Sequence, residues 1–90
     1  MNIVYDSAKR DKTLMERGLD FALAVDLFSG LTLTQPDTRV DYGETRYMTA
    51  GWLTGRMVVV VWTPRGANRR IISMRKANER ECEKLAPHLG

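Results

Sequence analysis

The sequence lacks most of the residue types from which disulfides, metal sites and catalytic triads are built. It has one cysteine, Cys82, and one histidine, His88, among 90 residues. One cysteine cannot form an intramolecular disulfide, and one histidine beside the C-terminus cannot supply a two-histidine metal site or a credible Ser-His-Asp triad. We therefore expect no disulfide, no metal and no cofactor.

Long apolar runs and glycine-rich loops are also missing. The longest apolar run covers residues 57–62, MVVVVW, whereas about 20 apolar residues are needed to cross a membrane as a helix. The N-terminal residues lack the pattern of a signal peptide, and no glycine-rich stretch could cradle a phosphate. The sequence therefore predicts one domain, spanning residues 1–90, in the cytoplasm.

Charge is distributed unevenly along the chain. Residues 1–45 carry five cationic and eight acidic side chains, whereas residues 46–90 carry nine cationic and three acidic ones. Ten of the fourteen cations are arginine, which binds phosphate or carboxylate with two parallel hydrogen bonds and stacks on bases. The basic second half predicts a polyanionic ligand, either a nucleic acid or an acidic protein.

The first half of the chain has the pattern of one strand and two helices. Residues 2–5 suit a short strand, and Asp6 is a candidate N-cap for a helix over residues 7–16 that Gly18 ends. A second helix follows Asp20, and its apolar side chains recur with the spacing typical of a face buried in the core. These side chains are Phe21, Ala24, Val25 and Phe28, with Leu27 alongside.

The second half has the pattern of a meander of strands. Strands are expected over residues 31–35, 45–53, 56–63 and 69–75. Thr54-Gly55 suits a two-residue hairpin turn and residues 64–68 a longer one. Residues 76–85 return to a helix, which Pro87 ends. This order predicts an α+β fold, in which an antiparallel sheet meander packs with two N-terminal helices and one C-terminal helix.

Hairpin geometry then places the basic side chains at the two ends of the sheet. The turn at Thr54-Gly55 sets Tyr47 opposite Trp62 and Arg46 opposite Thr63.

The next hairpin brings Arg69 and Arg70 to the same end as Arg46, while Arg75 and Lys76 lie at the other end, near Arg56. At about 3.3 Å per residue, Arg69 and Arg75 are roughly 20 Å apart, so one phosphate cannot contact both. The face that each arginine occupies stays open, because a change of one residue in the second turn would exchange the faces of the last strand.

These cations have two interpretations. Arginines at strand ends can simply stay hydrated and keep sheet edges from aggregating. Several of them interleaved with aromatic rings instead suit single-stranded RNA, because arginine and aromatic side chains stack on bases. Under the second interpretation, the residues that bind substrate RNA are Arg69, Arg70, Lys76, Tyr47 and Trp62.

RNA can be cleaved without a metal by its own 2′-hydroxyl, which attacks the adjacent phosphate. The reaction needs a proton acceptor, a positive group that stabilises the extra charge on the phosphate, and a proton for the leaving 5′-oxygen. Arg46 and Arg75 are the candidates for charge stabilisation and Glu44 for proton transfer, with Tyr47 and Lys76 in reserve. The expected catalytic residues are therefore Glu44, Arg46 and Arg75.

Three groups of residues occur in the order and spacing of a known family. They are Asp6, Lys9, Gly18 and Leu19-Asp20-Phe21; then Tyr42-Gly43-Glu44 and Arg46 with the apolar strand that starts at Arg56; then Arg70-Ile71-Ile72-Ser73, Arg75, Ala77 and Glu81. Across nearly its whole length, the chain resembles BrnT, the toxin of a bacterial type II toxin–antitoxin pair. It departs from that family at Glu16-Arg17, where relatives usually have Lys-His.

The resemblance implies a RelE-like fold and a ribonuclease toxin that cleaves RNA and arrests growth. It also implies neutralisation by a BrnA-like antitoxin with a ribbon-helix-helix DNA-binding region, so that operator DNA is contacted only through the antitoxin. The alternative is a non-catalytic basic subunit that binds the antitoxin and supports autorepression of the operon. Direct DNA binding fits poorly, because the final helix mixes Arg80 and Lys84 with three glutamates.

Overall fold

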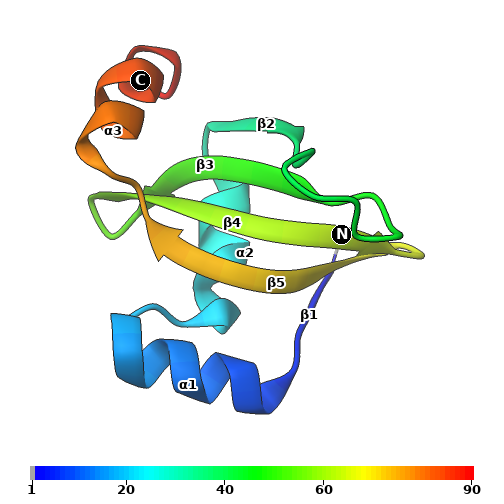
Figure 1. The fold of residues 1–90 in the computed structure, drawn as a ribbon. Helices are drawn as coiled ribbons and strands as arrows, with labels where there is room; N and C mark the ends of the chain where they lie inside the picture. Colours follow the sequence, from blue (N-terminus) through cyan, green and yellow to red (C-terminus); the bar gives the residue numbers. More distant parts are fainter. Residues whose placement is uncertain (1) are drawn as a thin grey trace.

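The computed structural model describes residues 2–90, which form a five-stranded sheet with helices on both faces (Figure 1). The sheet order is β1-β5-β4-β3-β2, so the predicted α+β class is confirmed. The strands are β1 (Asn2–Val4), β2 (Thr32–Pro36), β3 (Tyr47–Leu53), β4 (Arg56–Arg65) and β5 (Asn68–Lys76). The helices are α1 (Ser7–Arg17), α2 (Ala24–Ser29) and α3 (Glu79–Leu85), with 3₁₀ turns at Phe21–Leu23 and Ala86–His88.

β1 makes the sheet mixed, so the expectation of a wholly antiparallel meander is wrong. β2 to β5 are antiparallel to their neighbours, but β1 pairs with β5 in parallel, with Asn2 opposite Asn68 and Val4 opposite Arg70. Two parallel strands need a long connection between them. Here that connection contains both N-terminal helices and three other strands.

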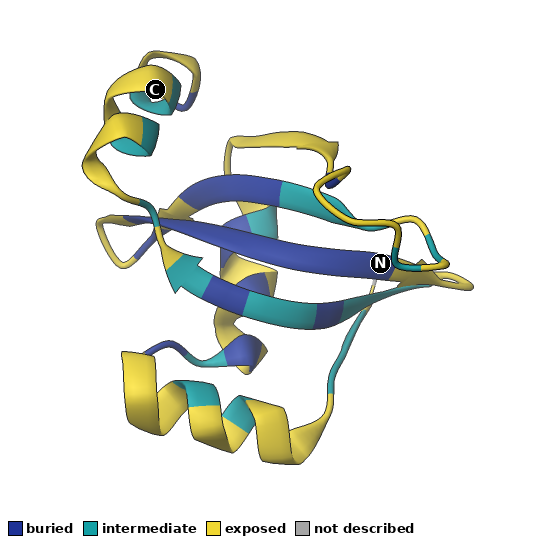
Figure 2. Cartoon of the chain, in the orientation of Figure 1, coloured by how far each residue is buried: buried dark blue, intermediate teal, exposed yellow. Residues whose placement is uncertain are grey.

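The sheet has a hydrophobic core on each face, and Figure 2 shows that β4 is buried along most of its length. The larger core lies under α2 and the 3₁₀ turn before it, and includes Phe21, Leu27 and Val58. The smaller core lies under α3 and includes Met57 and Val59. β4 supplies side chains to both cores, which explains why its sequence is apolar without alternation.

The second helix is shorter and less regular than its apolar spacing predicts. Residues 21–23 form a 3₁₀ turn, which has three residues per turn. The side chains on the buried side are therefore Phe21, Ala24 and Leu27, all 0% exposed. Val25, which was expected on the buried face, is 51% exposed, so the prediction is wrong at this position.

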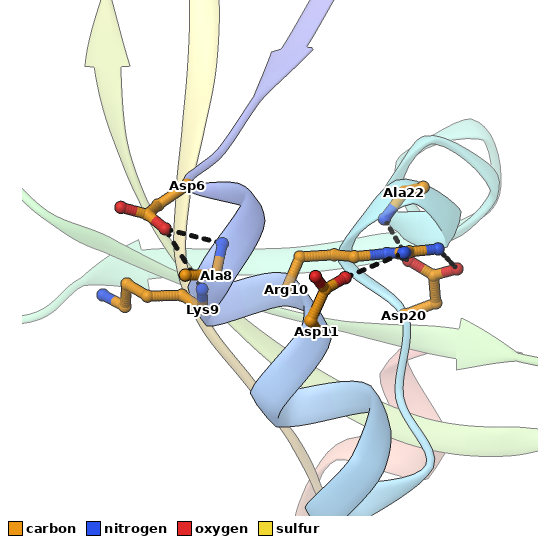
Figure 3. Close-up of polar contacts among 7 residues, drawn as sticks. All are labelled: Asp6, Ala8, Lys9, Arg10, Asp11, Asp20 and Ala22. Carbon is orange, nitrogen blue, oxygen red and sulfur yellow. Dashed lines mark hydrogen bonds and ion pairs between the residues drawn. The ribbon is translucent and has the colours of Figure 1, made fainter.

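α1 has the cap residues that the sequence predicts at both ends, and Figure 3 shows the one at its start. The Asp6 carboxylate accepts hydrogen bonds from the backbone N–H groups of Ala8 and Lys9, at 2.8 and 3.1 Å. Gly18 ends the helix in the left-handed conformation, with a φ of 68°. The helix has no buried side chain, so polar contacts rather than an apolar face hold it to the rest of the molecule.

The hairpin between β3 and β4 has the predicted turn and register. Thr54 and Gly55 both have positive φ, 49° and 76°, as a type I′ turn requires. Tyr47 lies opposite Trp62, as expected from a two-residue turn at this position.

The hairpin between β4 and β5 is tighter than expected. The predicted loop covers residues 64–68, but β4 continues to Arg65 and β5 begins at Asn68, which leaves a two-residue turn. Pro64 is tolerated in β4 because β3 begins only at Tyr47. Pro64 therefore has no neighbour in β3, and its missing N–H removes no ladder hydrogen bond on that side.

The C-terminal segment packs on the face opposite α2. Asn78 and Glu81 form a capping box at the start of α3. Beyond the helix, Trp52 Nε1 donates to the carbonyl of Leu89 at 3.1 Å. None of the helices in residues 2–90 has the length and apolar content needed to cross a membrane.

Candidate nucleic-acid interface

The structure assigns each arginine of β5 to a face of the sheet. Residues directly opposite each other in an antiparallel pair point to the same face. Arg75 lies opposite Val59, which belongs to the core under α3. Arg70 lies opposite Thr63. Thr63 is four residues from Val59 in β4, so Arg70 lies on the same face as Arg75. Arg69 lies on the other face, under α2. The basic side chains lie at two ends, as predicted, but they are also divided between two faces.

Glu44 and Arg46 meet on the segment between β2 and β3. Arg46 Nε donates to Glu44 Oε2 at 3.0 Å, and the guanidinium carbon of Arg46 lies 4.1 Å from the centre of the Tyr42 ring. Arg65 Nη2, at the end of β4, lies 3.4 Å from the other Glu44 oxygen. Two guanidinium groups thus share one carboxylate, and the side chains of Arg46 and Glu44 stay 24% and 27% exposed. The group has a surplus positive charge within reach of solvent.

A hollow of about 350 Å³ opens beside this group, a volume at the lower end of the range for ligand sites, which begins at about 300 Å³. Its walls come from residues 36–46 and include Asp37, Tyr42, Glu44 and Arg46. Sequence reasoning described most of this segment only as a polar loop. The hollow depends on side chains that fold back on one another, for which the sequence has no signature.

Asp37 fixes the shape of this segment. Its buried carboxylate accepts hydrogen bonds from Arg39 Nε and Nη2, both at 2.8 Å, and a longer one from the Tyr42 hydroxyl at 3.3 Å. The Arg39 hydrogen bonds are the main reason that the pKa of Asp37 is lowered to about 2. Sequence reasoning missed this pair, because an Asp and an Arg two residues apart in a loop carry no specific signal.

Arg75 is held by the protein itself. Its Nη1 and Nη2 donate to the two Glu81 oxygens at 2.7 and 2.9 Å, which ties β5 to α3. The same carboxylate accepts the backbone N–H of Asn78 at 3.0 Å. The Arg75 hydrogen bonds are the main cause that lowers the pKa of Glu81 to about 2, and the positive charge of Arg39 contributes. Charged side chains of the loop and of α3 therefore interact with one another. The Arg75 side chain remains 34% exposed.

Arg69 and the aromatic residues form a separate group on the α2 face. The Arg69 guanidinium carbon lies 4.0 Å from the ring centre of Phe28 and 5.0 Å from that of Trp62. Tyr47 packs on the same indole with ring centres 5.0 Å apart. Trp62 is only 7% exposed, and its Nε1 donates to Thr49 Oγ1 at 2.8 Å. Trp62 is thus a core residue, and its ring is not accessible to a base.

The eight site residues predicted from the sequence are divided equally between the two faces of the sheet. Lys76 lies opposite Val58, a residue of the core under α2. The α3 face holds Glu44, Arg46, Arg70 and Arg75; the α2 face holds Arg69, Tyr47, Trp62 and Lys76.

Residues 5–81 match a family model described as "Ribonuclease toxin, BrnT, of type II toxin-antitoxin system". The matched range contains the whole segment between β2 and β3, all of β5 and Glu81. No individually curated protein matches the chain significantly.

Proposed function

This chain belongs to the BrnT family of ribonuclease toxins from type II toxin–antitoxin systems, and we propose that it cleaves RNA internally, without a metal, through the RNA's own 2′-hydroxyl. The observation that carries the proposal is the Glu44–Arg46 pair beside the loop hollow, with Arg65 as a second cation. This group offers a carboxylate for proton transfer and positive charge for a phosphate at one place on the surface.

In the proposed reaction, Glu44 accepts the proton of the 2′-hydroxyl. The 2′-oxygen then forms a bond to phosphorus, and the bond from phosphorus to the 5′-oxygen breaks. Arg46 and Arg65 stabilise the additional negative charge on the phosphate oxygens, and the 5′-oxygen takes a proton from solvent. The products are a 2′,3′-cyclic phosphate and a 5′-hydroxyl.

We place the bound RNA on the α3 face. Arg70 and Arg75 lie on this face along β5, and they extend the positive surface away from Arg46. Arg75 retains its role as a phosphate contact, in competition with Glu81. Arg69 and the other predicted contacts on the α2 face are left out of this surface.

A type II system implies an antitoxin partner. We propose that the partner is BrnA-like, with a ribbon-helix-helix region through which the complex contacts operator DNA. We also propose that the toxin acts in the cytoplasm and that its fold is of the RelE type, with the four antiparallel strands as the shared element.

Replacing Arg46 tests the assignment directly. We expect Arg46→Ala to lower the rate of RNA cleavage by about 10²-fold to 10³-fold, the usual cost of removing one group that stabilises transition-state charge. Arg56→Ala is the matched control, because Arg56 is an exposed arginine at the other end of β4. Equal cleavage rates for the two variants, with both folded by circular dichroism, would show that Arg46 has no catalytic role.

The reaction class is tested by incubating the purified protein with RNA in excess EDTA. We expect cleavage to persist and the new ends to carry 2′,3′-cyclic phosphates. RNA that stays intact while the protein still binds the antitoxin would instead support the non-catalytic subunit. The internal pairing of Arg46 with Glu44 and of Arg75 with Glu81 is the observation that favours this alternative.

A further inference from the structure

A second hollow lies between α1 and the outer edge of β5. β1 pairs with β5 only up to Arg70, so β1 leaves the rest of this edge without a strand neighbour. α1 runs alongside the edge (Figure 1), and a hollow of about 390 Å³ lies between the two. Its walls are Lys9, Lys12, Thr13, Glu16 and Arg17 from α1, and two residues of β5.

Polar contacts hold α1 in place and leave the hollow open. Arg10 Nε and Nη2 donate to the two Asp20 oxygens, both at 2.8 Å, and Arg17 Nη1 donates to the Met74 carbonyl at 2.9 Å. Figure 3 shows Lys9 pointing away from the Arg10–Asp20 pair. A helix normally covers a sheet with an apolar face. This helix instead directs cationic side chains toward the sheet edge.

The hollow carries uncompensated positive charge. Its walls include three cations and one acid, Glu16. None of the ion pairs formed among residues 2–90 involves Lys9, Lys12 or Arg17. The three arginines at the loop between β2 and β3 (Arg39, Arg46 and Arg65, here called the loop group), in contrast, all pair with internal carboxylates. A concave surface with unpaired cations attracts anions more strongly than a flat one.

The floor of the hollow is an irregular part of β5. The pairing of β4 with β5 shifts register between Val61 and Trp62, which leaves Ile72 as an extra residue. Ile72 and Ser73 line the hollow. Bulges of this kind are frequent beside functional sites, because they bend a strand and redirect its side chains. Ser73 is three residues, or about 10 Å, from Arg70 on the proposed RNA-binding face.

We propose that the hollow between α1 and β5 binds the sugar-phosphate backbone of the RNA substrate, away from the scissile phosphate. This inference rests on the proposed ribonuclease function and adds a second binding site to it. Lys9 and Lys12 act as point charges on phosphate. Contacts to phosphate fix the position of a strand and carry no sequence information. The hollow therefore contributes affinity and leaves sequence preference to the loop group.

The test is binding of a fluorescent 2′-O-methyl RNA oligonucleotide, which cannot be cleaved by 2′-hydroxyl attack, across a series of salt concentrations. For the double variant Lys9→Ala/Lys12→Ala, we expect the Kd at physiological salt to rise about tenfold. We also expect the slope of log Kd against log salt to fall by about 1.4, because each phosphate contact on a single strand contributes about 0.7. Both lysines are exposed and alanine favours helices, so α1 should stay folded.

The matched control is Arg56→Ala/Lys84→Ala, which removes the same charge from exposed positions outside the hollow. We expect it to change the slope by less than half as much. Equal losses in the two double variants would show that only net charge matters, and would overturn the proposal. If Lys9→Ala/Lys12→Ala binds the RNA as tightly as the wild-type protein does, the proposal is overturned as well. The same holds if this variant binds RNA normally but no longer binds the antitoxin.

Cleavage assays separate this inference from the proposed function. With cleavable RNA, we expect Lys9→Ala/Lys12→Ala to raise KM and leave kcat unchanged, whereas Arg46→Ala lowers kcat. A protein that binds RNA through the two lysines but never cleaves it would contradict the ribonuclease and support the hollow. If the protein cleaves RNA but replacing the two lysines leaves KM unchanged, the ribonuclease function is supported and RNA binding in the hollow is contradicted.

Discussion

Single carboxylates hold this protein together by serving two partners at once. Asp20 accepts both Arg10 and the backbone N–H of Ala22, at 2.8 and 2.9 Å, so it caps the 3₁₀ turn and also fixes α1. Glu81 caps α3 and also binds Arg75. Removing such a residue takes the main partner from a guanidinium group and leaves a helix end uncapped, and the two costs occur together.

We expect Asp20→Ala to lower the free energy of unfolding by about 2 kcal/mol, because the loss of the cap alone costs about 1 kcal/mol and the part-buried Arg10 also loses its main partner. Urea denaturation measures the change. Asp11→Ala is the control, since Asp11 contacts the same arginine at 3.1 Å but is 68% exposed. An exposed pair contributes about 0–1 kcal/mol, so a control as unstable as Asp20→Ala would contradict this account.

Among the elements, α2 packs closely against β3 at a glycine of β3, Gly51. A Cβ atom added at Gly51 would lie 3.0 Å from Leu27 Cδ2 and 3.2 Å from Thr32 Cγ2. Leu27 is fully buried, so it has little freedom to move away. The glycine is needed here for space.

We therefore expect Gly51→Ala to destabilise the fold by about 1–3 kcal/mol, the usual cost of overpacking a core. Gly30→Ala is the matched control, because the nearest atom to an added Cβ there is 3.9 Å away and the backbone is extended, with a φ of −97°. That variant should be neutral or more stable by about 0.4–1 kcal/mol. Thermal melts followed by circular dichroism compare the two, and similar losses in both would contradict a packing role for Gly51.

The elements could be predicted where local chemistry determines them. Asp6 and Gly18 bound α1, and Thr54-Gly55 sets the β3–β4 register, because a cap or a turn depends only on neighbouring residues. The parallel pairing of β1 could not be predicted, because its partner, β5, lies far along the chain. The 3₁₀ turn that exposes Val25 also escaped prediction, since apolar spacing does not distinguish it from an α-helix.

At the level of the whole molecule, one ionised carboxylate holds the loop between β2 and β3 in shape and another attaches α3 to the sheet. Asp37 holds the segment between β2 and β3, and Glu81 holds α3, each through two hydrogen bonds from an arginine. Both pKa values are about 2, compared with about 4 in an unfolded chain. The fold therefore binds fewer protons than the unfolded chain does in acid.

A lowered pKa in the folded state gives stability that is complete above the unfolded pKa and is lost as the pH falls toward the folded one. We expect the Tm to stay nearly constant between about pH 8 and 5 and to fall between about pH 4 and 2. Glu81→Gln should lower the Tm at neutral pH and make the acid transition less steep. Glu83→Gln, an exposed substitution on the same helix, should do neither. A Tm that rises on acidification would contradict the assigned pairs.

The candidate site could be predicted only in part. The sequence led to Glu44 and Arg46, which the structure places in contact. It did not predict an RNA-binding role for Lys9 or Lys12, because the first half of the chain has a net negative charge. The net charge of a half-chain conceals a local surplus of cations when acids of the same half lie elsewhere on the surface. Asp20, for example, is paired with Arg10.

The pairing of β1 with β5 sets the order in which the protein can assemble during its own synthesis. Asn2 leaves the ribosome early, yet its partner, Asn68, belongs to the last strand. The β3–β4 hairpin can close as soon as it emerges, but the surface formed by α1 and β5 can exist only after β5 has emerged as well. A nascent chain from which β5 has not yet emerged should therefore be unable to bind nearby RNA through that surface, including the message from which it is being made.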